Sequence, residues 1–294
     1  MKPSEPSRIE RLRTHLVDEC LDMILITNEI NVQYLSGFSG DSSYLLVGHD
    51  SAVVLSDRRY ETQIASECPE LRMAIRPPNQ PMPELLREVL SQDNGGRIGL
   101  EAEHTSLATA KTFSDAISQT STKVQWEETR GLVENLRCIK DLTEQQNVIR
   151  AVKIAERAFL SVTSQLTPRT TEREVAHELE SVMRRLGAEG VSFSPIVGAQ
   201  PSGALPHYRP RDTPLGDTST LLIDWGANYQ GYASDLTRTL HQKTASQRFL
   251  DCYQAVLESQ LAAIDSVRGG VSARDVDAAA RTVLQGSGIG DAFK

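Results

Sequence analysis

Two aspartates, Asp224 and Asp235, lie on either side of a turn signal in the segment LLIDWGANYQGYASDLTRTL, residues 221–240. Apolar runs flank residues 228–231, and the ends of that short stretch tolerate turn conformations, so the segment is predicted to be a β-hairpin. A turn centred in the middle of those four residues places the two aspartates directly opposite each other. Facing side chains in antiparallel strands have Cβ atoms about 5 Å apart. The sequence therefore predicts two adjacent carboxylates on one face of a hairpin.

Such a pair of carboxylates is suited to binding a cation. Facing like charges destabilise a sheet, and the next facing pair expected on that side, Gly226 and Ala233, is small and leaves room. Hard divalent metals prefer carboxylate oxygens, and two carboxylates suit a dinuclear centre. The plain alternative is a solvent-facing pair without a ligand. The mostly apolar strand 221–225 favours a buried position instead, and Thr237 lies on the Asp235 face, where it could orient a ligand.

Composition is that of an ordinary globular protein with one large or two medium domains. The chain has 294 residues, of which 39% are hydrophobic and 24% are charged. Its formal net charge of −8 argues against nucleic acid or an anionic membrane as a partner. No apolar run reaches membrane-spanning length, and no secretory leader is recognised. We therefore expect a soluble, cytoplasmic protein.

The cysteines are spread along the chain without the close spacing of a zinc site. They are Cys20, Cys68, Cys138 and Cys252. We interpret them as buried thiols in a reducing compartment, since no disulfide framework is indicated.

The first part of the chain alternates helical and strand patterns, which is typical of an α/β domain. Helical spacing is found over residues 8–21, 82–90 and 107–117. The strand candidates are residues 23–26, 44–47, 52–55, 71–75, 98–100 and 124–126. We place this domain at residues 1–127 and a connecting helix or linker at residues 128–142.

The remaining residues, 143–294, contain an internal repeat. A shift of 101 positions lays the segment beginning at Thr143 over the segment beginning at Thr244 without a gap. Thr171-x-x-Glu174 then lies over Ser272-x-x-Asp275, and both patterns are typical of a capped helix start. Each half is therefore predicted to be a helix, a short turn and a second, capped helix, and we interpret the similarity as a duplication.

The two halves differ beyond the ends of their helices. The first half continues into predicted strands at residues 191–197 and into the aspartate hairpin, whereas the second reaches Lys294. In the alignment Lys294 corresponds to Phe193, where the strands of the first half begin. A domain built of two equivalent halves would lack the strands of its second half, so we interpret the chain as truncated at its carboxyl end.

Several motifs are shared with one known family. In the first domain they are NVQYLSGFSG, residues 31–40, and Asp57-Arg58-Arg59-Tyr60 with Gln63. In the second they are SFSPIVGAQPSGALPHYRP, residues 192–210, and DWGANYQGYASDLTRT, residues 224–239. On these motifs the chain resembles the creatinase-like and Xaa-Pro peptidases, which are related to methionine aminopeptidase. The resemblance implies an α/β N-terminal creatinase-like domain, followed by an α+β catalytic domain of the pita-bread fold that lacks the strands of its second half.

The resemblance also implies an activity and a metal site. The expected enzyme is an aminopeptidase or dipeptidase that cleaves the bond before proline in a peptide with proline in second position. Family members hold two divalent ions (manganese, cobalt or zinc) with two Asp, one His and two Glu, and the match assigns the Asp ligands to Asp224 and Asp235. A metal-bridged hydroxide is expected to attack the carbonyl that the metals polarise.

A catalytic histidine and an oligomer are implied by the same resemblance. His207 corresponds to a family histidine outside the metal shell that contacts substrate and stabilises the tetrahedral intermediate. The plain alternative for His207 is a loop histidine packed beside Pro206 and Tyr208. Family members are commonly dimers or tetramers, so a homodimer or homotetramer is expected.

Part of the implied ligand set is not found in the sequence. The ligand His belongs just after the last residues of this chain, and both ligand Glu lie further on. His241 lies beyond the Thr-Arg-Thr strand, and Glu258 has no partner carboxylate on its predicted helix, so neither substitutes. Two carboxylates alone bind a divalent ion weakly, and the 294-residue chain is therefore expected to be inactive.

Two other functions stay open. A creatinase uses the same fold to hydrolyse a non-peptide amidine without a metal, but the Asp pair and the Thr-Arg-Thr strand favour the peptidase. A pseudo-peptidase that binds peptides or a partner without cleaving them would explain the missing ligands. Retention of both Asp argues against it, because a metal-free domain gains stability by losing one of two facing carboxylates.

Overall fold

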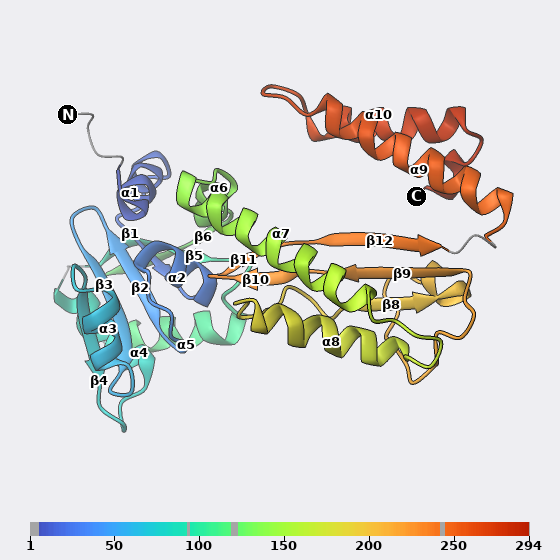
Figure 1. The fold of residues 1–294 in the computed structure, drawn as a ribbon. Helices are drawn as coiled ribbons and strands as arrows, with labels where there is room; N and C mark the ends of the chain where they lie inside the picture. Colours follow the sequence, from blue (N-terminus) through green and yellow to red (C-terminus); the bar gives the residue numbers. More distant parts are fainter. Residues whose placement is uncertain (1–5, 93–94, 119–122, 242–244, 294) are drawn as a thin grey trace, which may run out of the picture. The chain divides into compact units, whose positions relative to one another are not determined.

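The computed structural model of the protein describes residues 6–92, 95–118, 123–241 and 245–293 (Figure 1). The chain forms two compact units, Met1–Lys140 and Asp141–Lys294. Thr244 and Lys294, which enter the repeat alignment, lie outside the described residues. None of the helices in the described ranges combines the length and apolar character needed to cross a membrane.

A six-stranded mixed sheet forms the centre of the first unit, in the order β4-β3-β2-β1-β5-β6. β2 pairs antiparallel with both of its neighbours, and the other adjacent strands are parallel. The six predicted strands are confirmed, and no end differs from the predicted one by more than three residues. The strands are β1 (Met23–Ile26), β2 (Tyr44–Gly48), β3 (Ala52–Asp57), β4 (Arg72–Arg76), β5 (Gly96–Glu101) and β6 (Val124–Thr129).

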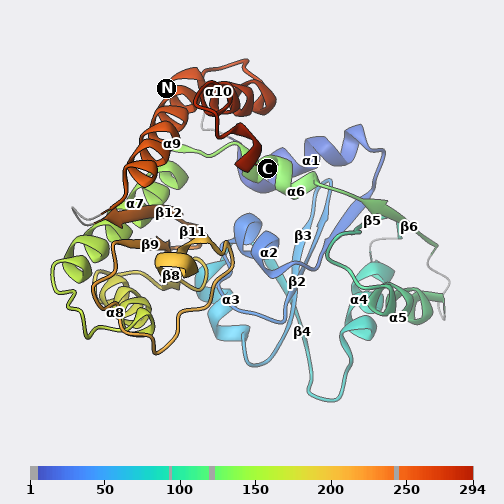
Figure 2. The same ribbon diagram turned by 90° about the vertical axis from the view of Figure 1, so that its right-hand side faces the viewer.

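Helices cover both faces of this sheet (Figure 2). One apolar cluster joins α1, α2, α3 and α6 to one face, and a second joins α4 and α5 to the other. The α/β architecture is thus confirmed, but α2 and α3 were not predicted because each is too short to show a clear helical period. The helices are α1 (Arg8–Asp18), α2 (Glu29–Ser36), α3 (Glu61–Glu67), α4 (Met82–Gln92), α5 (Leu107–Ser118) and α6 (Leu132–Cys138).

The stretch 128–142, predicted as a connecting helix or linker, contains the end of β6 and all of α6. Val133 and Leu136 of α6 are buried in the apolar cluster that includes α1. The division between the two compact units falls after α6, between Lys140 and Asp141.

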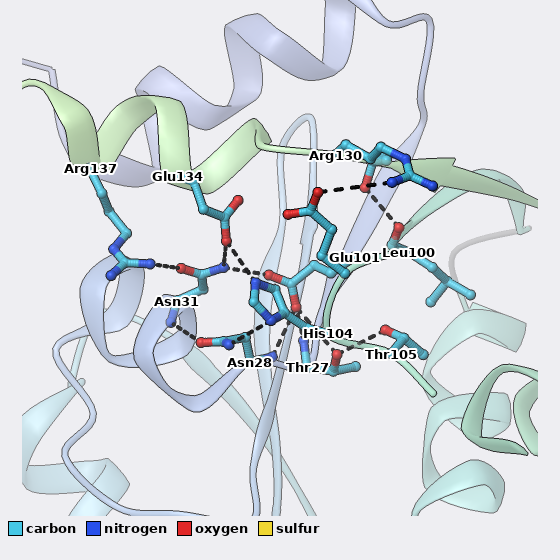
Figure 3. Close-up of polar contacts among 12 residues, drawn as sticks. Thr27, Asn28, Asn31, Leu100, Glu101, His104, Thr105, Arg130, Glu134 and Arg137 are labelled. Carbon is cyan, nitrogen blue, oxygen red and sulfur yellow. Dashed lines mark hydrogen bonds and ion pairs between the residues drawn. The ribbon is translucent and has the colours of Figure 1, made fainter. Parts of the chain in front are cut away.

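A polar network ties α2 and α6 to the carboxyl end of β5 (Figure 3). The Glu101 carboxylate, at the end of β5, accepts hydrogen bonds from the backbone N–H of Asn28 (2.9 Å) and from the side chain of Asn31 (2.7 Å). The Asn31 amide also donates to Glu134 of α6 (2.6 Å), which is in contact with His104 (3.1 Å). Asn31 is fully buried. Asn31, the first residue of the NVQYLSGFSG motif, therefore links α2 to β5 and α6 within the first unit.

The second unit contains two small sheets and two helical hairpins. The sheets have the orders β11-β10-β7 and β12-β9-β8. The strands are β7 (Gly190–Val191), β8 (Ile196–Ala199), β9 (Thr220–Trp225), β10 (Ala227–Tyr229), β11 (Tyr232–Ala233) and β12 (Leu236–His241), and a 3-10 helix, η1 (Gln200–Ala204), follows β8. The helices are α7 (Leu142–Thr163), α8 (Glu172–Arg185), α9 (Gln247–Ser266) and α10 (Ala273–Gly286), with a short 3-10 turn η2 (Gly290–Ala292).

The two helical hairpins confirm the predicted repeat. α8 begins after the N-cap Thr171, whose side chain accepts from the Glu174 N–H and completes a capping box. α10 begins after the N-cap Ser272, whose side chain accepts from the Asp275 N–H. Both ends of α10 lie 101 positions after the corresponding ends of α8. Among the described residues that follow β12, the structure has helices and turns and no strand.

The cysteine interpretation is wrong for two of the four residues. Cys68 is buried and Cys252 is half-buried, but Cys20 and Cys138 are exposed. The exposed pair lies at helix ends, Cys20 in the turn after α1 and Cys138 as the last residue of α6, where side chains leave the packed face.

Candidate metal centre

Strand β9 carries Asp224 and has one face in the core and one outside it. Leu221, Ile223 and Trp225 are at most 4% exposed, whereas Leu222 and Asp224 between them are half-buried. This alternation is the ordinary period of a strand with one packed face. We call the side of Leu222 and Asp224 the open face of the sheet β12-β9-β8.

The core face of β9 is fixed against α7. The indole N–H of Trp225 donates to the carbonyl oxygen of Ala155 (2.9 Å), and the indole ring stacks on Phe159 with ring centroids 4.6 Å apart. Trp225 is 1% exposed, so its hydrogen-bonding group has found a partner inside the core. Its neighbour Asp224 is thereby held on the opposite face.

The register of the hairpin differs from the predicted one, in which Asp224 faces Asp235. In the antiparallel pair β9–β12, Asp224 lies opposite Thr237. Asp235 precedes Thr237 by two residues, so the strand period places it on the same face, as a diagonal neighbour of Asp224 with Cα atoms about 7–8 Å apart. The predicted direct facing is wrong, although both carboxylates belong to the open face.

The turn of the hairpin explains this difference. Gln230 and Gly231 have φ angles of +49° and +77°, and a two-residue type I′ loop requires positive φ at both central positions. The turn is therefore centred between these two residues, one residue later than predicted, and every pairing moves by two. Asn228 faces Ala233, so the predicted facing of Gly226 and Ala233 is also wrong.

Asp224 is held by one direct hydrogen bond and is close enough to Asp235 to be affected by its charge. The Thr237 hydroxyl donates to Oδ1 of Asp224 (2.9 Å). Burial raises the pKa of Asp224 above its ordinary value of 3.8, and the negative charge of Asp235 adds to that rise, whereas the hydrogen bond from Thr237 lowers it. Asp235 itself is exposed. The ionised form of Asp224 is thus disfavoured by its surroundings when no cation is near.

The donor set fits part of a divalent-metal site. Asp224 and Asp235 offer the carboxylate oxygens that hard divalent cations prefer, and a cation between them would relieve their repulsion. In the parts of the chain that the structure describes, no group of three or more His, Cys, Asp or Glu side chains forms a fuller ligand set. These two aspartates would hold a metal at the open face, and Thr237 would fix the orientation of the Asp224 carboxylate.

His207 lies in an exposed turn that follows η1. η1 packs on the open face, because a Cβ atom placed on Gly203 would lie 3.2 Å from Cβ of Leu222, two residues before Asp224. No hydrogen bond or ion pair joins His207 to either aspartate among the described residues. The structure thus brings the loop of His207 to the open face without a direct contact between the predicted catalytic and metal-binding side chains.

A residue without any sequence signal anchors that loop. Glu172, the first residue of α8, is 1% exposed and accepts hydrogen bonds from the Ala199 N–H, the Tyr208 hydroxyl and the Arg211 N–H. Its position inside the pattern Thr171-x-x-Glu174 hid it, because an acidic residue in the first turn of a helix is expected for the helix dipole alone.

Known proteins are similar to this chain along almost its whole length. Residues 146–294 match metallopeptidase family M24, and residues 8–139 match the creatinase/prolidase N-terminal domain. The Xaa-Pro dipeptidase of Pyrococcus furiosus is 27% identical over 288 residues, which cover 97% of this chain and 79% of that protein. The uncharacterized peptidase YqhT of Bacillus subtilis is 29% identical over 286 residues, with coverage of 97% and 79%.

Solved structures show the same similarity in three dimensions. The Xaa-Pro dipeptidase from Bacillus anthracis superposes with a TM-score of 0.90 at 30% identity, covering 97% of this chain and 78% of that one. The X-Pro aminopeptidase from Thermotoga maritima superposes with a TM-score of 0.85 at 29% identity, covering 92% and 77%.

Proposed function

The chain belongs to metallopeptidase family M24, and from this premise we propose that it hydrolyses the peptide bond before a proline in second position. Similar proteins bear the names Xaa-Pro dipeptidase and X-Pro aminopeptidase, so the proposal includes dipeptides and longer peptides as substrates. A creatinase/prolidase N-terminal domain precedes the peptidase domain, as in an Xaa-Pro peptidase of the predicted kind.

The arrangement that supports this proposal most directly is the Asp224 carboxylate on the open face of the sheet. It is half-buried, oriented by the Thr237 hydroxyl at 2.9 Å, and affected by the charge of Asp235. A metal-free protein would be more stable without two such carboxylates on one face. Their presence in this geometry favours a cation as the missing partner.

Each residue of the proposed site has its own task. Asp224 and Asp235 would hold the divalent ions, and Thr237 keeps the Asp224 carboxylate in a fixed orientation. When bound, manganese, cobalt or zinc polarises the scissile carbonyl and lowers the pKa of the attacking water. His207 donates a hydrogen bond to the substrate oxygen that becomes negatively charged as the carbonyl carbon turns tetrahedral.

The proposal is tested with purified protein, Mn²⁺ and three peptides, Ala-Pro, Ala-Pro-Ala and Ala-Ala. We expect Mn²⁺-dependent cleavage before proline and none of Ala-Ala, with loss of activity in Asp224→Asn and a reduction of about 10²- to 10³-fold in His207→Ala. Equal cleavage of Ala-Pro and Ala-Ala would overturn the substrate assignment. Absence of cleavage combined with a melting temperature that does not respond to Mn²⁺ would overturn the metallopeptidase proposal for this chain.

Two expectations stay predictions under this proposal, a homodimer or homotetramer and a cytoplasmic location. The inactivity that the sequence predicts for the 294-residue chain from its two carboxylate ligands is the opposite outcome to the proposed cleavage. The peptide assay measures the inactivity directly, and light scattering after size-exclusion chromatography measures the oligomer.

A further inference from the structure

The carboxylate of Glu172 accepts hydrogen bonds from a single loop, residues 199–211. Oε1 accepts from the backbone N–H of Ala199 at 3.0 Å. Oε2 accepts from the hydroxyl of Tyr208 at 2.8 Å and from the backbone N–H of Arg211 at 3.3 Å. Glu172 is 1% exposed, so these donors replace the water that the carboxylate loses on folding.

The backbone at the start of α8 holds the returning limb of the same loop. The Glu172 N–H donates to the carbonyl oxygen of Thr213 and the Arg173 N–H donates to that of Arg211, both at 3.1 Å. Next to them, Thr171 forms an antiparallel bridge with Pro214. The chain that follows Tyr208 is thus fixed along the first turn of the helix.

The first part of the loop, from β8 through η1, is fixed by close packing against β8 and the open face. A Cβ atom on Gly198 would lie 2.7 Å from the backbone nitrogen of Gly203, which shows how closely η1 folds back on β8. Gly203 in turn lies against Leu222 on the open face. The loop that carries His207 is therefore held between the start of α8 and the face that bears Asp224.

We propose that Glu172 is a positioning residue for His207, and this inference rests on the proposed function. A buried carboxylate is strongly unfavourable unless donors surround it, and all three donors here come from one loop conformation. Only that conformation satisfies the carboxylate, so Glu172 restricts the loop to it. Tyr208 transmits the restriction to the residue that precedes it, His207.

Helix capping does not account for Glu172. The N-cap position of α8 is filled by Thr171, and Glu174 completes the capping box through the Thr171 N–H (2.8 Å). Glu174 is exposed and touches the helix start alone, whereas Glu172 is buried against the loop. The two glutamates therefore form a matched pair for experiment, with the same residue type in the same helical turn.

The test compares Glu172→Gln, Tyr208→Phe and the control Glu174→Gln. In Glu172→Gln the new side-chain amide would turn its own N–H groups toward at least one of the three donors of the loop. Tyr208→Phe removes one hydrogen bond to the Glu172 carboxylate. Glu174→Gln affects only the N-terminal cap of α8. Hydrogen exchange of the peptide 199–211, read by mass spectrometry on the full chain, reports the loop without requiring activity. We expect exchange of the Ala199 and Arg211 amides to become roughly tenfold faster in Glu172→Gln, to increase less in Tyr208→Phe, and to match the parent in Glu174→Gln.

Activity provides the second measurement. In the parent, Glu172→Gln is expected to lower kcat/KM for Ala-Pro by about 10- to 100-fold, mainly through kcat. In a His207→Ala background the same change should lower kcat/KM by less than about threefold, because the His207 imidazole on which Glu172 acts is already absent. Equal losses in both backgrounds would show a general structural effect and overturn the positioning role.

The two proposals fail in different ways. If His207→Ala lowers activity but Glu172→Gln does not, the inference is overturned and the function is kept. If no variant or parent cleaves the peptides, the proposed function is overturned for this chain, and the exchange experiment still decides whether Glu172 fixes the loop. Unchanged exchange of residues 199–211 in Glu172→Gln would overturn the inference in either case.

Discussion

The carboxylate of Asp224 occupies a position that is unfavourable for a charge without a nearby cation. It is half-buried, burial and the charge of Asp235 raise its pKa, and the hydrogen bond from Thr237 compensates only in part. A divalent ion bound by both carboxylates would reverse this balance, since it favours the ionised forms. The Asp224 site is therefore expected to respond to a divalent metal more strongly than any other part of the open face.

Asp224→Asn should abolish the response of the melting temperature to Mn²⁺. We expect millimolar Mn²⁺ to raise the melting temperature of the parent by about 2–5 °C and to leave the variant unchanged, because one of two ligands is lost. Asp217→Asn provides the control, since Asp217 is an exposed aspartate in the turn before β9. A parent and an Asp224→Asn variant that respond equally to Mn²⁺ in scanning calorimetry would contradict the ligand role.

The sequence predicted that Asp224 and Asp235 lie on one side of a hairpin, but it predicted the wrong pairing between the strands. The apolar runs and the turn residues were sufficient to predict a hairpin with both aspartates on one side. The register depended on whether Gln230 adopts positive φ together with Gly231, and a glutamine gives no signal for that conformation. Glu172 was missed for a related reason, because its partners come from a loop that is distant in sequence.

Gly226 links the two small sheets of the second unit. Its carbonyl oxygen accepts from the Ser192 N–H (2.9 Å), and a Cβ atom at this position would overlap the carbonyl oxygen of Ser234. Ser234 is itself engaged with Ala227, through a backbone hydrogen bond at 2.9 Å and a side-chain hydrogen bond at 3.0 Å. The hairpin can therefore pass from β9–β12 to β10–β11 only with a glycine at this point.

Gly226→Ala should destabilise the protein by about 2–4 kcal/mol, because the backbone at Ser234, between β11 and β12, must move away from residue 226 to admit the methyl group. Gly286→Ala, at the end of α10, is the matched control, since no atom lies within 4 Å of its added Cβ. It should be neutral or slightly stabilising. Urea denaturation of the two variants measures the difference, and equal stabilities would contradict the close approach at Gly226.

The polar network of the first unit should make it sensitive to acid through Glu134. Burial acts to raise the pKa of Glu134, but hydrogen bonds from Asn31 and His104 outweigh it and hold the pKa below its ordinary value of 4.5. A carboxyl group with a lowered pKa in the folded state stabilises the fold above pH 4.5 and loses that contribution as the pH falls through its folded value. The other charged groups of the network are Glu101 and Arg137 (Figure 3).

Glu134→Gln tests this dependence. The variant should be less stable than the parent at pH 7 by about 0.5–1 kcal/mol, since water partly screens the site, and the difference should shrink at an acid pH well below 4.5, as the carboxyl group of the parent becomes protonated. Urea denaturation at the two pH values provides the measurement. Glu128→Gln, a change of an exposed glutamate in β6, is the control. A difference between Glu134→Gln and parent that is equal at both pH values would contradict the assignment.

Elements with a clear period or cap were predictable from sequence, and short ones were not. The capped starts of α8 and α10 follow from Thr171 and Ser272, whose side chains accept the predicted backbone hydrogen bonds. α2 and α3 span eight and seven residues, so the helical period repeats too few times to be distinguished from a loop. Their positions are decided instead by tertiary contacts, such as those of Asn31 and Ile64.

The predicted order of a creatinase-like domain and a pita-bread catalytic domain is confirmed by the family matches and by the solved structures. The duplication within the second unit has a physical consequence. α7 contributes Ile154, Ala155 and Ala158 to the core of the unit. In contrast, α9 has only Ala255 and Ser259 buried.

An apolar stripe on α9 should therefore cause the chain to self-associate. Val256, Leu257, Leu261 and Ile264 are 56%, 37%, 50% and 59% exposed, and they lie on the side of α9 opposite the buried Ala255 and Ser259. Contiguous exposed apolar surface favours association, since burying each such side chain contributes about 1.5–3 kcal/mol. In sedimentation velocity, we expect the parent to form larger species as its concentration rises. In a variant that carries both Val256→Lys and Ile264→Lys, the dissociation constant of self-association should be at least about tenfold weaker. Glu258→Lys changes the net charge by the same amount as the double variant, but Glu258 is an exposed residue of α9 outside the stripe, so this control should behave like the parent. If the double variant and the parent sediment alike at every concentration, the stripe has no part in association, and any oligomer must form through another surface.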